Sequence, residues 1–330
     1  MIQNKESVKL DEVLKSLFST SHKVLLEFLN SIFDENYSSE EVEILVGNGE
    51  FSLENSNYDL IRGDLFLNLL TNKETSANYH IEFQTKNDTT MAIRMFEHGF
   101  NKARELSDTN KNIFYFPKQL VIFVEENSNI EDELKLKIVF PNGKEVDYSV
   151  AVMKYWQYSD KELIQKKLYP LLPLQIFKFR KELDKVSRSK SNSQEKINII
   201  LEKAKQMAFL VAKEVKELNS NNEILDEDLH KMLLAIQNLI EYLNTNYGVD
   251  DKIEEEVSNM TKTLYDPVVA EAAAKIAKVE SALKVLNSLF GEIPQEYVDK
   301  INNATIETID NIFVNLGKIK EMKEIEKFLH

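Results

Sequence analysis

The sequence predicts an α/β protein: a mixed β-sheet with flanking helices, followed by an all-α C-terminal region. In residues 1–186, short apolar runs of strand character alternate with helical segments. Residues 187–193 (Ser-Arg-Ser-Lys-Ser-Asn-Ser) are polar and serine-rich, which is typical of a linker. Throughout 194–330 the apolar residues recur with the helical period. We therefore expect a core domain, a linker and a helical region with these boundaries; an α+β core is the alternative.

The core begins with a predicted helix over residues 24–33, for which Ser21 is a suitable N-cap. Two strands are expected at 62–70 and 79–85, since both stretches are short, apolar and bounded by polar residues. A polar segment, 71–78, joins them. These two strands are predicted to form a hairpin.

The second half of the core is predicted as helix, strand and hairpin. A helix capped by Thr89 or Thr90 runs to about Leu106. Its regularly spaced residues are Met91, Arg94, Met95 and His98. The continuous apolar run 119–124 indicates a strand buried on both faces. Two more strands, 134–140 and 146–155, flank a Pro-Asn-Gly turn.

The C-terminal region is predicted to contain helices near 194–218 and 226–247 and a long one over 266–290. Asp266 as N-cap, Pro267, Gly291 and Pro294 delimit the long helix. Its apolar stripe follows 3-4 spacing through Ile276, Val279, Leu283, Leu286 and Phe290. The stripe covers only two heptads, so packing within the region is favoured over a seam that would make a homo-oligomer.

Composition restricts the class of protein. The chain has no cysteine, which excludes disulfides, thiolate metal sites and cysteine nucleophiles. It shows neither a signal-peptide pattern nor a run of the ~20 apolar residues that cross a bilayer, so we expect a cytoplasmic protein without membrane contact. The net charge of −14 argues against a protein that simply coats nucleic acid. Residues 61–240 are nevertheless nearly neutral, with 27 basic and 26 acidic side chains.

Three side chains on the predicted hairpin form the candidate site: Asp64, Glu82 and Gln84. Side chains alternate along a strand, so Glu82 and Gln84 share one face. If the loop places Leu70 opposite Asn78, Asp64 lies opposite Gln84 and diagonal to Glu82, about 7–8 Å away. From the two strands alone, the favoured interpretation is that these residues line the solvent face of an edge hairpin.

The chemistry of this trio is that of a metal-dependent phosphodiesterase. Two adjacent carboxylates repel each other, and bound Mg²⁺ or Mn²⁺ would neutralise them, polarise a phosphate and activate a water. Gln84 would orient the water or a phosphate oxygen, and the Phe83 carbonyl is a further candidate ligand. His80 shares the face of Glu82, but a solvated histidine at a strand end is favoured. Arg94 could hold a phosphate or form a surface ion pair.

A basic string follows the core strands, and it could track a DNA backbone. Interspersed acidic residues favour a solvated helix face instead. The basic residues are Lys178, Arg180, Lys181, Lys185, Arg188 and Lys190.

Asp64 followed by Ile81-Glu82-Phe83-Gln84 resembles the PD-(D/E)XK nuclease core, in particular the group of transposases called recombination-promoting nucleases. Other segments are similar to that group in the same order, over about residues 10–185 and, more weakly, 265–330. They are Leu25-Leu26-Glu27-Phe28-Leu29-Asn30, Met91-Ala92-Ile93-Arg94-Met95, Pro170-Leu171-Leu172-Pro173-Leu174 and Leu289-Phe290-Gly291-Glu292-Ile293-Pro294. The last ~65 residues resemble a small accessory domain.

The resemblance implies a restriction-endonuclease-like core and Mg²⁺-dependent DNA cleavage, with Asp64 and Glu82 as the acids. Gln84 stands where the general pattern has lysine, so a positive charge is missing. Glu27 is the candidate for an assisting acid on the first helix. The alternative is a catalytically weak or inactive protein of this fold that acts as a binding or regulatory module through its acidic helical C-terminal half.

Overall fold

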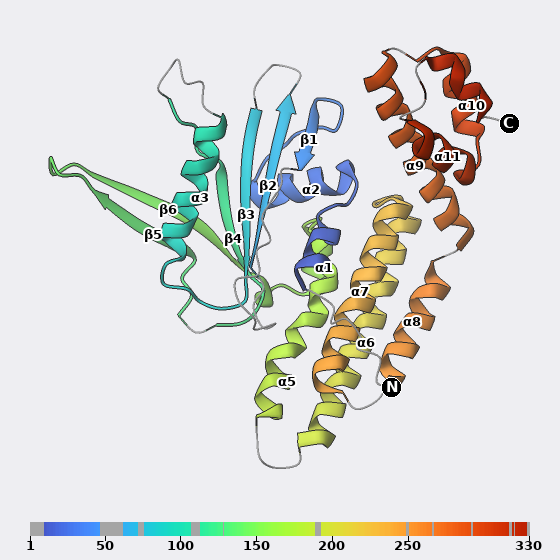
Figure 1. Cartoon of the computed structure of the whole chain (residues 1–330). Helices are drawn as coiled ribbons and strands as arrows, with labels where there is room; N and C mark the ends of the chain where they lie inside the picture. Colours follow the sequence, from blue (N-terminus) through green and yellow to red (C-terminus); the bar gives the residue numbers. More distant parts are fainter. Residues whose placement is uncertain are drawn as a thin grey trace. The chain divides into compact units, whose positions relative to one another are not determined.

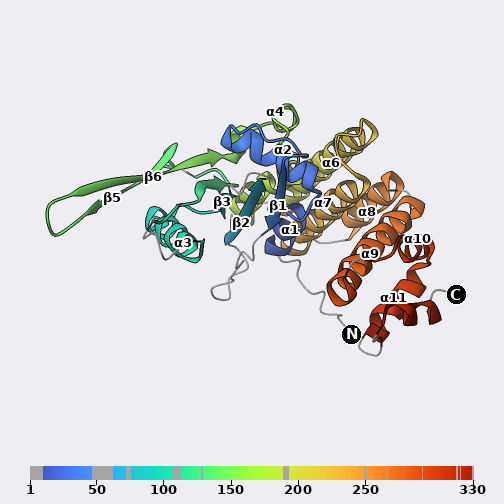
Figure 2. The same cartoon turned by 90° about the horizontal axis from the view of Figure 1, so that it is seen from above.

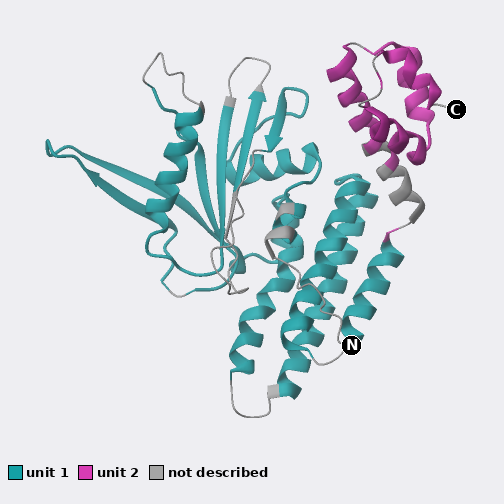
Figure 3. Ribbon diagram, viewed as in Figure 1, with its two compact units in different colours: residues 1–264 teal, residues 265–330 magenta. Residues whose placement is uncertain are grey.

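The structure is a computed structural model. It describes residues 10–46, 62–71, 76–106, 113–127, 129–188, 193–248, 251–265, 267–291, 293–316, 319 and 321–328. The chain divides into two compact units, residues 1–264 and 265–330 (Figure 3). The division does not fall in the predicted linker at 187–193. The second unit coincides in extent with the predicted accessory domain.

A mixed sheet lies at the centre of the first unit, as predicted (Figure 1). Its strand order is β1-β2-β3-β4-β6-β5; β3–β4 and β4–β6 are parallel, and the other pairs are antiparallel. The strands are β1 (Val42–Val46), β2 (Arg62–Thr71), β3 (Ser76–Gln84), β4 (Lys118–Phe123), β5 (Glu133–Val139) and β6 (Glu145–Lys154). Only β1 was not anticipated from the sequence.

The register of the β2–β3 hairpin differs from the predicted one by two residues. Leu70 pairs with Ser76 rather than Asn78, because both strands continue further toward the loop than the polar segment suggested. Asp64 is therefore the direct partner of Glu82 instead of lying diagonal to it. A shift of two residues preserves the face of each position, whereas a shift of one would have reversed it.

Helices cover both faces of this sheet (Figure 2). On one side lie α1 (Leu10–Leu17) and α2 (His22–Phe33); the ring of Phe33 contacts Tyr79 at 4.8 Å. Ser21 caps α2 as predicted, by accepting the Val24 N–H. The other face carries α3 (Met91–Leu106), which connects β3 to the parallel strand β4. Just before this helix the side chain of Asp88 accepts the backbone N–H of Thr90 at 2.9 Å.

The predicted double burial of the run 119–124 is confirmed for its apolar part, since Val121, Ile122 and Phe123 are fully inaccessible. Met91 and Met95 of α3 pack on Val121 and Phe123. After the β5–β6 hairpin, whose turn has Gly143 at a φ of +81°, the chain forms η1 (Tyr155–Gln157), α4 (Asp160–Gln165), η2 (Tyr169–Phe179) and α5 (Arg180–Ser187).

The helices after the predicted linker belong to the same unit as the sheet. They are α6 (Ser193–Ser220), α7 (Asp226–Tyr247) and α8 (Lys252–Leu264). Buried Asp228 joins α7 to the start of α2: its carboxylate accepts the backbone N–H and the hydroxyl of Ser21, both at 2.6 Å, and the N–H of Leu225 at 3.0 Å. A carboxylate satisfied by three donors fixes both helix ends at once.

The second unit is a small helical body made of α9 (Pro267–Phe290), α10 (Gln295–Asn303), α11 (Ile306–Asn315) and η4 (Met322–Lys327). Pro267 begins α9 and Gly291 follows it with a φ of +77°, as predicted; Asp266 and the side chain of Ile276 lie outside the described part. The apolar stripe of α9 packs inside the unit: Val279 and Leu286 belong to the same buried core as Ile301 and Ile309.

None of the helices in the described part of the chain combines the length and apolar content that a membrane crossing requires.

The stability of the first unit should depend on pH through Glu214. Burial, and next the neighbouring Asp160 carboxyl, raise the pKa of Glu214 from 4.5 to about 8. The folded state therefore keeps a proton that the unfolded state releases, so this stabilisation is complete below about pH 4.5 and is lost as the pH rises to about 8. We expect Glu214→Gln to flatten the decline of the unfolding free energy across that range, measured by urea titration at several pH values.

Glu195→Gln, on the exposed start of the same helix, is the matched control and should leave the pH dependence of wild type unchanged. A Glu214→Gln curve parallel to that of Glu195→Gln would contradict the assignment.

Candidate functional site

A row of polar side chains on the α3 side of β3 forms the candidate site. His80, Glu82 and Gln84 alternate with Tyr79, Ile81 and Phe83, and all six are at most 1% exposed. The polar row is buried because β3 is an interior strand and α3 covers this face. The alternative of a solvent-facing edge hairpin is therefore wrong, and so is the expectation of a solvated His80.

Two hydrogen bonds reach the same carboxylate oxygen of Glu82. Its Oε1 accepts a hydrogen bond from Nη2 of Arg94 at 2.9 Å and another from the amide of Gln84. Nη1 of Arg94 lies 3.5 Å from Asp88. Arg94 is 24% exposed, so the pair is an ion pair at the edge of the interior rather than on the surface.

Gln84 contacts Glu82 directly. Its amide nitrogen donates to Glu82, so the side chain fixes the orientation of this carboxylate. An amide in this position cannot supply the charge of the lysine that the general family pattern has there.

For Asp64 and the Phe83 carbonyl, the structure gives the backbone position. The register pairs Asp64 with Glu82 and Arg62 with Gln84, while the side chains of Asp64 and Arg62 lie outside the described part. The Gln84 carbonyl accepts from Val124 on the β4 side. Since successive carbonyls alternate along a strand, the Phe83 carbonyl points toward β2, where Asp64 is located.

His80 is held by Phe66 and Gln119. Its ring stacks on Phe66 with centroids 4.4 Å apart, and its Nδ1 lies 2.9 Å from Nε2 of Gln119. The amide of Gln119 is oriented by its other contacts, because Nε2 donates to the Met95 carbonyl at 2.7 Å and Oε1 accepts from Tyr148. Nδ1 of His80 is thus an acceptor, which leaves the proton of the neutral ring on Nε2, the atom facing Glu82.

Two features around Gln119 support this orientation. Burial, opposed by the hydrogen bond to Gln119, raises the pKa of the Tyr148 hydroxyl, so Tyr148 keeps the proton that it donates. Gly99 provides the space: a Cβ at this position would come within 2.9 Å of the Gln119 amide nitrogen.

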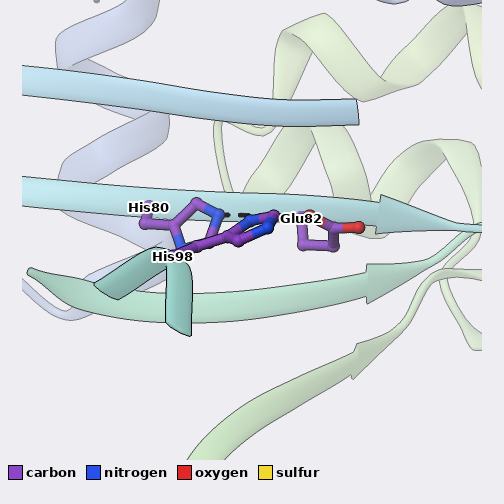
Figure 4. A group of neighbouring side chains, drawn as sticks. All are labelled: His80, Glu82 and His98. Atoms are coloured by element: carbon purple, nitrogen blue, oxygen red, sulfur yellow. Dashed lines mark ion pairs between the residues drawn. The ribbon is translucent and has the colours of Figure 1, made fainter. Parts of the chain in front are cut away.

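His98 of α3 completes a cluster with His80 and Glu82. One potential ligand atom of each residue lies within 4.8 Å of those of the other two. Figure 4 shows His98 reaching from α3 toward the two side chains of β3. Sequence reasoning did not assign His98 to the site, although its i,i+4 spacing from Arg94 on one helix face was a usable signal.

The family resemblance implies Mg²⁺ as the ion of this site. Mg²⁺ binds through one or two carboxylates and keeps several waters. The paired positions of Asp64 and Glu82 fit that requirement. The described nitrogen groups around Glu82, from Arg94, Gln84 and the imidazoles, do not add ligands that Mg²⁺ prefers.

Glu27 and three residues of the basic string have partners other than the residues of the polar row. Glu27 accepts a hydrogen bond from Lys167 at 2.9 Å. Arg180 is only 2% exposed and pairs with Glu125 at 2.9 Å, so both predictions for the string are wrong at this position. Lys178 donates to the Tyr158 carbonyl and Lys181 to that of Glu126, while Lys190 lies outside the described part.

Comparison with known proteins yielded no match among protein-family models, curated proteins or solved structures.

Removal of Arg94 should destabilise the first unit. Glu82 is 1% exposed, and Arg94→Met would leave its carboxylate without the guanidinium that it contacts. Loss of one partner of a buried pair costs about 3–5 kcal/mol, and the partial exposure of Arg94 places the expected loss at the lower end, about 3 kcal/mol. The measurement is the unfolding free energy from urea titration.

Arg104→Met, at an exposed position of the same helix, is the control and should change stability by less than about 0.5 kcal/mol. Equal effects of the two substitutions would show that the Arg94–Glu82 pair is not important for folding.

Proposed function

We propose that the chain is a metal-dependent endonuclease that hydrolyses phosphodiester bonds in DNA. The observation that carries the proposal is the register of the hairpin, which makes Asp64 and Glu82 direct partners on two interior strands. Gln84 follows on the same face, two residues after Glu82. The two acidic positions are those that the resemblance to PD-(D/E)XK nucleases requires, and Gln84 stands at the place of the lysine in the general pattern.

The topology supports the same proposal. An antiparallel pair carries the acidic positions, and a helix connects its second strand to a parallel neighbour within a mixed sheet. This agrees with the restriction-endonuclease-like core that the resemblance implies.

Asp64 and Glu82 would hold Mg²⁺ or Mn²⁺, which would supply charge neutralisation, polarisation of the phosphate and an activated water. The protein's own groups act around this pair. Gln84 keeps the carboxylate of Glu82 in one orientation, as its hydrogen bond indicates. Arg94, partly exposed and already at Glu82, provides a guanidinium that can bind a phosphate oxygen.

Two arginines would supply the positive charge that the lysine of the general pattern provides. Arg94 contacts Glu82 directly, and Arg62 occupies the position opposite Gln84 on β2. A guanidinium is permanently charged and suits phosphate oxygens geometrically. The positive charge that Gln84 lacks would thus come from its neighbours.

A binding or regulatory protein of the same fold is the second candidate. The observation that favours it is the state of Glu82, which is buried and engaged by Arg94 and Gln84. A carboxylate satisfied in this way can serve the fold alone. In that case the chain would act through its acidic C-terminal half and would not cleave DNA.

Nicking of supercoiled plasmid DNA in the presence of Mg²⁺ or Mn²⁺ distinguishes the two functions. Asp64→Asn and Glu82→Gln should each reduce the cleavage rate ~10²–10³-fold, the size of effect that follows loss of one preorganised charge-stabilising group. Glu43→Gln, on an exposed position of β1, should cleave like wild type.

Cleavage that survives both site substitutions would assign the activity to a contaminant or to another site. Absence of cleavage by folded wild-type protein with either ion would favour the binding protein.

A further inference from the structure

We propose that His80, Glu82 and His98 form a binding site for a first-row transition-metal dication, with Zn²⁺ preferred over Mg²⁺. The site goes beyond the proposed nuclease function. It shares Glu82 with the predicted Mg²⁺ pair, but its other ligands are imidazoles, and it does not depend on Asp64.

The two oxygens of Glu82 face different partners. Oε1 is occupied by the hydrogen bonds from Arg94 and Gln84. Oε2 lies on the side of the imidazoles, 4.0 Å from Nε2 of His80 (Figure 4). The guanidinium of Arg94 and the amide of Gln84 therefore both contact Oε1, and Oε2 is the oxygen that lies near the imidazole of His80.

The distances within the cluster are close to those of a metal site. Zn²⁺ binds histidine nitrogens and carboxylate oxygens at about 2.0–2.2 Å, which places tetrahedral ligand atoms roughly 3.3 Å apart. The three ligand atoms lie within 4.8 Å of one another. Movements of about an ångström or less would thus bring the side chains around one ion.

The type of ligand determines the class of ion. Two imidazoles and one carboxylate suit Zn²⁺ and its first-row neighbours, with a fourth position left for water or another ligand, whereas Mg²⁺ requires oxygen ligands. Burial strengthens the argument, because His80 and Glu82 are at most 1% exposed. An ion here would connect α3 to β3, since His98 comes from the helix and the other two residues from the strand.

Gln119 is the positioning residue that this site would use. With the amide oriented as described, Nδ1 of His80 accepts and Nε2 carries the proton. Coordination through Nε2 moves that proton to Nδ1, and rotation of the Gln119 amide then presents its oxygen to the new N–H. A metal-bound histidine usually donates its other N–H to such an oxygen. The loss of the Gln119 hydrogen bond to Met95 opposes this change.

Calorimetric titration of the metal-stripped full-length chain with Zn²⁺ and, separately, Mg²⁺ tests the site. We expect one Zn²⁺ per chain, and Zn²⁺ affinity at least ~100-fold weaker in His98→Ala, since loss of even an outer-shell partner typically costs 10–100-fold. His230→Ala, at an exposed position of α7, is the matched control and should bind Zn²⁺ like wild type. Equal Zn²⁺ affinity in the two variants, or tighter binding of Mg²⁺ than of Zn²⁺ by wild type, would overturn the proposal.

Co²⁺ provides a readout that does not depend on folding stability. Bound at this site it should give visible absorption bands of a low-coordinate complex, and these should be absent in His98→Ala and in His98→Asn, whose side chain is shorter but polar. Bands that persist in both folded variants would exclude His98 as a ligand.

Asp64→Asn separates this proposal from the nuclease. It should abolish Mg²⁺-dependent cleavage and leave Zn²⁺ affinity within about twofold of wild type. Wild-type cleavage without Zn²⁺ binding defeats only the transition-metal site, and Zn²⁺ binding without cleavage defeats only the nuclease. A large loss of Zn²⁺ affinity in Asp64→Asn would contradict the independence of the two ligand sets.

Discussion

A carboxylate buried in the middle of a sheet is the constraint on which this site depends. Removal of an ionised side chain from water costs several kcal/mol unless opposite charge and hydrogen bonds replace the solvent. Glu82 meets this requirement through Arg94 and Gln84 on Oε1, while Oε2 lies 4.0 Å from Nε2 of His80. His80 is held in turn by Gln119, whose amide is fixed by Met95 and Tyr148. Glu82 and His80 are therefore each positioned by hydrogen bonds from neighbouring side chains.

Helix α3 combines two tasks on one surface. Met91 and Met95 close the apolar core over Val121 and Phe123, and Arg94 and His98 approach the polar row of β3. Because these residues recur at three- and four-residue intervals, packing of the methionines also sets the depth of the arginine and the histidine. The geometry of the candidate site thus depends on an ordinary hydrophobic contact.

The net charge of −14 means that a polyanionic substrate meets repulsion over much of the molecule. Attraction then has to be local. Arg94, which contacts Glu82, together with any bound dication, would concentrate positive charge at the polar row. In the proposed nuclease, the paired acidic positions Asp64 and Glu82 and the phosphate would require the same cation.

The helices after the serine-rich stretch show how composition misleads about domain boundaries. Residues 187–193 have the composition of a linker, yet α6 and α7 pack with η2 and α1 in the first unit. Buried Asp228 on α7 binds Ser21, more than two hundred residues away in sequence. A polar, serine-rich composition indicates that a segment is exposed to solvent. It does not indicate whether the elements before and after that segment pack together.

The sequence by itself determined the local elements. Alternation and apolar runs placed β2 to β6, helical spacing placed α2, α3, α6, α7 and α9, and Ser21, Pro267 and Gly291 marked helix ends. It also placed Glu82 and Gln84 on one face, since strand periodicity is a property of the backbone. Only the tertiary structure decided the register that pairs Asp64 with Glu82, the burial of His80 and Arg180, and the approach of His98 and Gln119. These features arise from contacts between segments distant in sequence, where hairpin length and helix docking, rather than any local pattern, set which side chains meet.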